Sequence, residues 1–489
     1  MSTRKEAAWH CFLVLAVWAA IYLPGLGTLE IKGEEGRRIL PAIAMLQSGN
    51  YIVPQVGSEP YFRKPPLVNW LVAGSFKLLG QRSEWTARIP SALSVLVVAV
   101  AFLAVGRGTL GATGALLGAL VWMTNFGVIE KGRLIEIEAV YVSLCGLALI
   151  FWLSAWYEQR SRWITWTVPW IFLGLGLLAK GPLLLLFFYA VILSVLFRSG
   201  ELRSALSFPH ALGLLLMLGI FAAWAVPCLL MMSSSGVTQV WTRQLSGRIS
   251  GENFQLGGWL LNIPRGLCYF LPWTPLLALA RSARFAEPRR AALAQGLTWA
   301  VAVSFLGLSL VPGALARYTM PLLAPAAWLI AMILTAEALA WPRGWQLRRP
   351  NFLRPELRLP AIVTVLVCAA IALYAVVLMP FLQQRAKIRN LGAEINAKLA
   401  TPDPLYAVAP DYQPLLFYVR DPIAYLDRIA EVPADAKYLL VQPAQEGEAT
   451  ASRQWNPRWA RPILRLKDYR NKEVILLEIG PAARFGAGA

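Results

Sequence analysis

Charged residues are scarce in this sequence of 489 residues. Only 15% of the residues carry charge, against about 25% in an ordinary soluble protein. Hydrophobic residues make up 57% of the chain, which excludes a disordered protein. So few charges cannot cover the water-facing surface of a soluble enzyme. The composition therefore predicts an integral membrane protein.

Histidine and cysteine are also rare, and their placement restricts the chemistry. The only histidines are His10 and His210, and the topology derived below puts both on the cytoplasmic side. An external site would therefore have no histidine for catalysis or zinc binding. The five cysteines lie in apolar stretches and form no CxxC pair, so neither a disulfide framework nor a thiolate metal site is indicated.

Long apolar runs are abundant, and their length is that of transmembrane helices. They lie near residues 10–28, 90–107, 110–129, 138–156, 163–179, 182–197, 209–232, 266–281, 293–311, 319–341 and 360–382. The first run has no convincing small-x-small cleavage site, which favours an uncleaved helix over a signal peptide. The fold class we expect is mainly α, a polytopic transmembrane bundle of about 11–13 spans.

Basic residues alternate between the loops in a way that predicts orientation. With the N-terminus inside, the cytoplasmic loops contain the basic runs RSARFAEPRR (281–290) and PRGWQLRRPNFLRPELR (342–358). This positive-inside pattern explains much of the formal charge of +19 without nucleic acid. An odd number of spans then places the chain after residue 382 outside.

Three segments outside the spans are expected on the external side, at about 29–89, 233–265 and 383–489. In the first, RILPAIAMLQSGNY places Ile39, Leu40, Ile43 and Leu46 on one face of a helix, as in helices that lie along a membrane surface.

The last segment has a soluble composition, and we expect a transmembrane domain at 1–382 followed by a small α/β domain at 383–489. Its predicted elements are a helix in RAKIRNLGAEINAKLA and strands in LYAVA (405–409), PLLFYV (414–419), YLLVQ (438–442) and EVILLEI (473–479).

Acids and bases gather on the external side of this topology. They occur in KGEEGRR (32–38), YFRKPP (61–66), EKGRLIEIEAV (130–140), AKGP (179–182) and ALARY (314–318). A carboxylate can take a proton from a hydroxyl nucleophile, and lysine and arginine can hold a phosphate. Each residue alone has a simpler explanation, such as a solvated loop acid or a snorkelling lysine. Their shared location predicts a site that cleaves a sugar from a lipid phosphate.

The order of several motifs resembles the ArnT-like branch of the GT-C membrane glycosyltransferases, which includes the lipid A aminoarabinose transferase and relatives of the protein O-mannosyltransferases. The matching motifs are KGEEGRR, then GNYIVPQVGSEPYFRKPPLVNWLVAGSFKLLG, EWTARIPSAL, GRLIEIEAV, GLGLLAKGP and RYTMPLLAP. The first 90 residues are the specific part of a resemblance that covers about residues 10–330. It implies a GT-C bundle with juxtamembrane helices.

The resemblance also implies roles for individual residues. Glu34 would be the first-loop catalytic acid that activates or orients the acceptor, and Glu138 would be the second acid. Glu35 and Arg37 would complete the acid-acid-x-Arg motif that begins at Glu34, and they are the other catalytic candidates. The candidate ligands of the polyprenyl phosphate are Lys64, Arg248, Lys180, Arg63, Tyr318 and Arg317. The family transfers the sugar in one displacement that inverts the anomeric carbon.

Two departures from the family bear on cofactor and substrate. The aminoarabinose transferases have a glutamate before the phosphate-binding lysine and a histidine in the second external loop, both near a bound metal. Those positions look like Arg63 and Gln244 here, so we expect no zinc cofactor, while a divalent metal on other ligands stays open. Glu34 and Glu138 stand where the family usually has aspartates. A glutamate is longer by one methylene group, so its carboxylate reaches about 1 Å further, and a misplacement of that size can lower the reaction rate.

We therefore expect a glycosyltransferase of the bacterial inner membrane, with a cytoplasmic N-terminus and a periplasmic C-terminal domain. Its partners would be an undecaprenyl-phosphate-linked sugar, the lipid bilayer and an envelope acceptor, which could be lipid A, another glycan or a protein. The alternative is a transporter or flippase of lipid-linked glycans. Transporters place ionisable residues at the membrane midplane between repeats, whereas these charges gather at one face.

Overall fold

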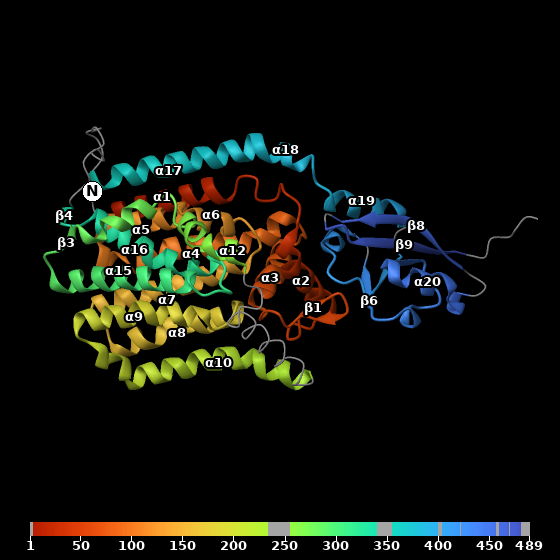
Figure 1. Ribbon diagram of the computed structural model, residues 1–489, viewed down its shortest axis with the longest axis horizontal. Helices are drawn as coiled ribbons and strands as arrows, with labels where there is room; N and C mark the ends of the chain where they lie inside the picture. Colours follow the sequence, from red (N-terminus) through yellow and green to blue (C-terminus); the bar gives the residue numbers. More distant parts are fainter. Residues whose placement is uncertain are drawn as a thin grey trace, which may run out of the picture. The chain divides into compact units, whose positions relative to one another are not determined.

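The computed structural model describes residues 3–232, 255–339, 355–399, 403–420, 422–455, 459–468 and 470–480. The chain forms two compact units (Figure 1). Unit 1 contains Met1–Leu26, Phe62–Val68 and Arg88–Val377, and unit 2 contains Gly27–Tyr61, Asn69–Ala87 and Leu378–Ala489. Most of the expected external segment at 29–89 thus belongs to the same unit as the C-terminal region. The domain boundary near residue 382 stays a prediction.

Unit 1 is almost entirely helical. Its helices and short strands are α1 (Thr3–Tyr22), α4 (Glu84–Ala104, of which the first turn belongs to unit 2), α5 (Arg107–Thr124), α6 (Phe126–Gly132), α7 (Ile137–Tyr157), α8 (Arg162–Ala179), α9 (Leu183–Ser199), α10 (Phe208–Met231), α12 (Leu256–Leu260), α13 (Asn262–Cys268), α14 (Thr274–Leu277), β3 (Ala283–Arg284), α15 (Pro288–Ser309), α16 (Leu323–Leu334), β4 (Ala338–Leu339) and α17 (Pro355–Leu373). Three 3₁₀ helices, Leu202–Leu206, Ala278–Arg281 and Ala316–Leu322, connect them.

The expected polytopic helical bundle is confirmed. Among the described residues, seven helices are long and apolar enough to cross a membrane, or eight if the bent pair α5 and α6 is one span. Two further apolar helices, α3 (Leu67–Leu79) and α9, are shorter. The single span expected at 266–281 is wrong, because α13 ends at Cys268 and α14 begins at Thr274. Pro272 and Pro275 lack the N–H groups that a continuous helix would need.

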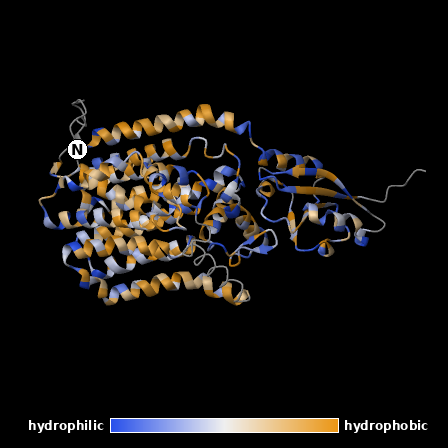
Figure 2. Cartoon of the chain, viewed as in Figure 1, coloured by the Kyte–Doolittle hydropathy of each residue, from blue (hydrophilic) through white to orange (hydrophobic). Residues whose placement is uncertain are grey.

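Burial differs strongly between the helices and distinguishes the centre of the bundle from its lipid-facing surface. In α7 and in the segment Ala316–Leu334, about nine-tenths of the span is buried by other parts of the protein. By contrast, α10 and the segment Glu356–Gln383 are buried over only 22% and 11% of their spans. Both are hydrophobic along their length (Figure 2). Such apolar surface requires lipid around it.

The motif around Arg133 ties the end of α1 to the bundle. One amino group of Arg133 donates to the carbonyl of Ile21, and the other lies 2.5 Å from the carbonyl oxygen of Pro24. The phenol of Tyr22 donates to the carbonyl of Met123 at 2.8 Å. These bonds satisfy carbonyls that the end of a helix leaves without partners. Arg133 therefore stabilises the fold of the segment that precedes Glu138.

Unit 2 combines helices from the first external segment with a C-terminal sheet. Its elements are the 3₁₀ turn Gly33–Glu35, α2 (Gly36–Ser48), β1 (Gln55–Val56), β2 (Glu59–Pro60), most of α3, α18 (Met379–Gln383), α19 (Ile388–Lys398), β5 (Leu405–Val408), the 3₁₀ helix Pro414–Tyr418, β6 (Ile423–Leu426), the 3₁₀ turn Ile429–Glu431, β7 (Tyr438–Val441), α20 (Pro443–Ala451), the 3₁₀ turn Arg453–Trp455, β8 (Trp459–Lys467) and β9 (Glu473–Gly480). The helix predicted in RILPAIAMLQSGNY (38–51) forms as α2, with Ile39, Leu40 and Ile43 buried and Leu46 exposed.

The five-stranded sheet has the order β6-β5-β7-β9-β8. Strand β5 is parallel to β6 and β7, whereas β9 is antiparallel to β7 and β8. Helix α20 and Trp455 pack with the buried side chains of β5, β7 and β9 in one core. The predicted strands at 405–409, 438–442 and 473–479 and the helix near 388–398 are confirmed.

The strand expected at 414–419 is wrong, because Pro414 to Tyr418 form a 3₁₀ helix. Proline favours the first helical position, and the consecutive residues Leu415, Leu416 and Phe417 are all buried, unlike the alternating residues of a half-buried strand. Strand β8 was not predicted, because Pro462 interrupts its sequence. It lies at the edge of the sheet, with a bulge between Pro462 and Leu464, where proline costs no ladder bond.

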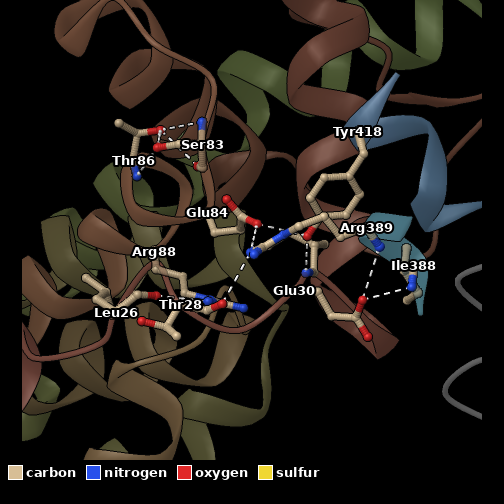
Figure 3. A network of polar contacts seen from close by, with 11 residues as sticks. Leu26, Thr28, Glu30, Ser83, Glu84, Thr86, Arg88, Ile388, Arg389 and Tyr418 are labelled. Carbon is tan, nitrogen blue, oxygen red and sulfur yellow. Dashed lines mark hydrogen bonds and ion pairs between the residues drawn. The ribbon is translucent and has the colours of Figure 1, made fainter. Parts of the chain in front are cut away.

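A polar network joins three separate parts of unit 2 (Figure 3). The guanidinium of Arg389 lies 2.5 Å from the carboxylate of Glu84, which also accepts a bond of 3.1 Å from the phenol of Tyr418. The carboxylate of Glu30 accepts the N–H groups of Ile388 and Arg389 at the start of α19, where the helix dipole favours an acid. Burial and the nearby Glu84 raise the pKa of Tyr418, so its phenol remains a donor at neutral pH.

We expect Glu84→Ala to destabilise the attachment of α19 by about 1–3 kcal/mol, because the partly buried Arg389 loses its carboxylate. Hydrogen exchange of the α19 amides measures this loss. Asp403→Ala is the matched control, because its partner Lys437 lies at 2.9 Å but has a side chain that is 57% exposed. An exposed pair contributes about 0–1 kcal/mol. Equal exchange in the two variants would contradict the role of the network.

Candidate functional site

Glu138 lies at the centre of an ion cluster in unit 1. It belongs to the first turn of α7, while Lys180 follows the last residue of α8 and Arg317 lies in the 3₁₀ helix Ala316–Leu322. Oε1 of Glu138 is 3.1 Å from Nζ of Lys180 and 3.4 Å from Nε of Arg317. Three helix ends thus bring one carboxylate and two cations together.

The surroundings of Lys180 are aromatic. Its ammonium lies 4.9 Å from the ring centre of Tyr318 and 5.2 Å from that of Tyr141, which is within the range of cation–π attraction. The side chains of Glu138 and Lys180 are only 9% and 13% exposed, whereas that of Arg317 is 35% exposed. Two cations on one acid leave a net positive charge, which suits an anion such as a phosphate.

A second ion group precedes α7. The ammonium of Lys131 in α6 lies 2.9 Å from both Glu130 and Glu136, and its side chain is 7% exposed. Burial raises the pKa of Glu136, and the neighbouring Lys131 opposes that shift. These residues belong to the charged motif at 130–140, which predicts no individual role for them. The alternation of acidic and basic residues is the only feature of the sequence that indicates this ion group.

Arg63 and Lys64 precede α3 and belong to the same unit as Glu138. Arg63 is exposed and Lys64 is half-buried. The buried prolines at 65 and 66 follow, and α3 begins at Leu67. The ring of a proline clashes with the backbone of the residue before it, so Pro65 restricts Lys64 to extended conformations next to the helix start.

Glu34 forms a separate cluster in unit 2, at the 3₁₀ turn before α2. Its carboxylate lies 3.8 Å from Arg37 and 3.6 Å from Arg38, and its side chain is 50% exposed. Arg38 is buried and donates to the phenol of Tyr61 at 2.9 Å. Glu35 is buried as well. Glu34 is thus the accessible acid of the motif, and two guanidiniums lie beside it.

The structure brings together four predicted residues, Glu138, Lys180, Arg317 and Tyr318, and separately three others, Glu34, Glu35 and Arg37. Arg248 lies outside the described residues. Because the two clusters belong to different units, their convergence into one site stays a prediction. The sequence motifs predict no role for four residues in or next to these ion groups, which are Arg38, Tyr61, Tyr141 and Lys131.

The residues that the structure describes do not supply the donors of a metal centre of the family type. The resemblance implies that Arg63 replaces a glutamate of the aminoarabinose transferases, and a guanidinium cannot ligate a cation. Within the described ranges, no group of three or more His, Cys, Asp or Glu side chains is placed to hold a metal ion. His210 lies against the rings of Trp166 and Trp170 and bonds Tyr189 at 3.0 Å. Gln244 lies outside the described residues.

Known proteins resemble this chain in both sequence and structure. A family model described as dolichyl-phosphate-mannose-protein mannosyltransferase matches residues 63–226. The crystal structure of ArnT from Cupriavidus metallidurans bound to undecaprenyl phosphate covers 97% of this chain and 98% of its own, with a TM-score of 0.66 and 18% identity. The chain has the ArnT fold. The expected resemblance to the ArnT-like GT-C proteins is thereby confirmed at the level of the fold.

Several curated relatives of this chain carry the name undecaprenyl phosphate-alpha-4-amino-4-deoxy-L-arabinose arabinosyl transferase. The protein of Pseudomonas savastanoi pv. phaseolicola is 28% identical over 341 residues, which are 69% of this chain and 63% of that protein. The protein of Pseudomonas aeruginosa strain LESB58 is 26% identical over 340 residues, which are 68% of this chain and 60% of that protein. The match with this chain thus spans less than two thirds of the length of these relatives.

Proposed function

We propose that this chain is an inverting glycosyltransferase that moves a single sugar from an undecaprenyl-phosphate donor to an acceptor in the cell envelope. The observation that carries the proposal is the buried Glu138 with Lys180 and Arg317 in a chain of the ArnT fold. A phosphate that leaves a sugar gains negative charge, and preorganised cations stabilise that charge in the transition state.

In the proposed reaction an acceptor hydroxyl attacks the anomeric carbon of the donor sugar. The new carbon–oxygen bond forms as the bond to the phosphate oxygen breaks, so the anomeric centre inverts. Glu34, whose carboxylate is half exposed, takes the proton of the hydroxyl. Arg37 and Glu35 would stabilise the conformation of the motif that contains Glu34.

The leaving lipid phosphate would be held by Lys64, Arg248, Lys180 and Arg317, with Arg63 and Tyr318 as further contacts. Arginine binds phosphate through two parallel N–H groups, and lysine acts as a compact charge. Glu138 would fix the two cations that contact it, because its carboxylate lies within 3.4 Å of both. The proposed chemistry contains no metal-dependent step.

The names of the relatives support an undecaprenyl-phosphate-linked aminoarabinose as one candidate donor. The acceptor classes are lipid A, another envelope glycan and a protein hydroxyl. The protein spans the membrane several times. We propose that it lies in the bacterial inner membrane with its N-terminus in the cytoplasm and residues 383–489 in the periplasm, in agreement with the positive-inside pattern.

The proposal is tested by incubating the purified protein in lipid vesicles with radiolabelled undecaprenyl-phosphate sugars and each class of acceptor. We expect label on an acceptor in equal amount to released undecaprenyl phosphate. Movement of intact donor across the vesicle membrane without cleavage would instead establish a flippase. Retention of all label on the donor with every acceptor, without such movement, would also contradict transfer.

Lys64→Ala is expected to lower the transfer rate by about 10²-fold, because the departing phosphate loses one stabilising charge. Lys77→Ala is the matched control: Lys77 is an exposed lysine in the last turn of α3, which follows the Lys-Pro-Pro segment. The initial rate at saturating acceptor measures the effect. Equal rates in the two variants would remove Lys64 from the proposed site.

A further inference from the structure

Tyr412, from the C-terminal region, lies against the motif that contains Glu34. Its phenol donates a hydrogen bond to the carbonyl of Gly33, and its side chain is buried. A Cβ atom at Gly36 would overlap the phenol oxygen and would lie 3.1 Å from two carbons of the ring. Glycine is therefore required at position 36 for this close approach.

Two guanidinium groups lie over the ring of Tyr412. The Cζ atom of Arg37 is 4.9 Å and that of Arg470 is 5.0 Å from the ring centre. These distances allow cation–π attraction. Arg470 also donates to the backbone carbonyl of Tyr412 at 2.7 Å. Tyr412 thus contacts one arginine of the Glu34 motif and one arginine of the turn between β8 and β9.

Arg470 is itself fixed by the turn between β8 and β9. Its Nε atom donates to the carboxylate of the buried Asp468 at 2.6 Å. The same carboxylate accepts the backbone N–H groups of Arg470 at 2.8 Å and of Lys472 at 2.9 Å. A continuous set of contacts therefore runs from the sheet through Asp468, Arg470 and Tyr412 to Gly33 and Arg37.

The ion pairs of Glu34 hold its own side chain only loosely. Gly33 has a φ of +57°, a conformation that glycine adopts without cost and leaves easily. The two ion pairs of Glu34 are 3.6 and 3.8 Å long, which is beyond hydrogen-bond distance. A catalytic acid must be held close to its productive position, since an error of about 1 Å can cost 10²-fold in rate.

We propose that Tyr412 is a positioning residue for Glu34, through which the C-terminal sheet holds the catalytic motif in place. The proposal rests on the proposed transferase function. It gives the C-terminal region a task in the transfer step, carried by the contacts of one tyrosine with Gly33, Gly36 and Arg37.

Tyr412→Phe and Tyr412→Ala test this role in the full-length protein. Loss of the hydroxyl should lower kcat for sugar transfer by about fivefold to tenfold, the size of one hydrogen bond. Loss of the whole ring should lower kcat by about 10²-fold. The KM for the lipid donor should stay unchanged, because Tyr412 holds the acid and not the phosphate. Tyr406→Phe, in β5 of the same sheet, is the control and should keep the kcat of the unmodified protein.

Hydrogen exchange of the amides at 31–38 supplies a readout that does not depend on activity. Both Tyr412 variants should speed this exchange, and Tyr406→Phe should not. Unchanged exchange and unchanged kcat in Tyr412→Ala would overturn the proposal. If the unmodified protein transfers no sugar, the proposed function fails, while the exchange result still decides whether Tyr412 holds the motif.

A double variant tests the direct contact. Gly36→Ala should lower kcat, because its methyl group would collide with the phenol oxygen of Tyr412. Tyr412→Phe removes that oxygen, so the pair Gly36→Ala and Tyr412→Phe should have a higher kcat than Gly36→Ala alone. A pair no faster than Gly36→Ala would contradict the contact.

Discussion

Glu34→Gln is expected to lower the rate of sugar transfer by about 10²–10⁴-fold, because an amide cannot take the proton of the acceptor hydroxyl. The substitution keeps the size of the side chain, and the half-exposed position tolerates a neutral group. Donor binding should remain, because the proposed phosphate ligands are other residues. Single-turnover transfer from a radiolabelled lipid donor separates the chemical step from binding.

Glu59→Gln is the matched control for Glu34→Gln. Glu59 is an exposed acid in β2 of the same unit, and it has no place in the proposed site. Its variant should transfer sugar at the rate of the unmodified protein. Full activity of Glu34→Gln under the same conditions would dismiss Glu34 as the base.

Glu138→Ala is expected to destabilise unit 1 by about 3–5 kcal/mol, because it leaves two cations without their buried carboxylate. Lys180 is most affected, since its side chain is 13% exposed and lies 3.1 Å from the lost acid. The midpoint of thermal unfolding in detergent measures the loss. Transfer should fall as well, since the positions of Lys180 and Arg317 depend on Glu138.

Glu158→Ala is the control at the other end of α7. Glu158 lies 2.7 Å from Arg160, whose side chain is 53% exposed, so solvent replaces the lost partner. We expect a change of about 0–1 kcal/mol. Equal midpoints for Glu138→Ala and Glu158→Ala would contradict the structural role of the buried cluster.

Much of the Glu138 cluster could be predicted because its signal is local. Lys180 interrupts an otherwise apolar run, and Glu138 opens an apolar helix, so each residue stands out against its neighbours. Helix ends at one side of a bundle lie close together, which is why Arg317 also joins the cluster. The predicted membrane topology therefore indicates that these residues lie together, whereas their spacing in the sequence does not.

The contacts of Tyr412 could not be predicted, because its partner Gly33 lies 379 positions away in the chain. No periodic pattern of residues along the sequence indicates such a contact. The C-terminal region shows the same limit in its secondary structure. Pro414 begins a buried 3₁₀ helix and Pro462 interrupts an edge strand, and only the position of each element in the fold decides between these outcomes.

The proposed reaction requires that Glu34 and Lys64 face the same compartment outside the cytoplasm. Its most direct test is labelling of Glu34→Cys and Lys64→Cys with a membrane-impermeant maleimide in intact spheroplasts, after the five native cysteines are replaced by alanine. Arg160→Cys, between α7 and α8, is the expected cytoplasmic control. We predict that positions 34 and 64 are labelled and that position 160 is labelled only after lysis. Labelling of positions 34 and 64 from opposite sides would contradict the account.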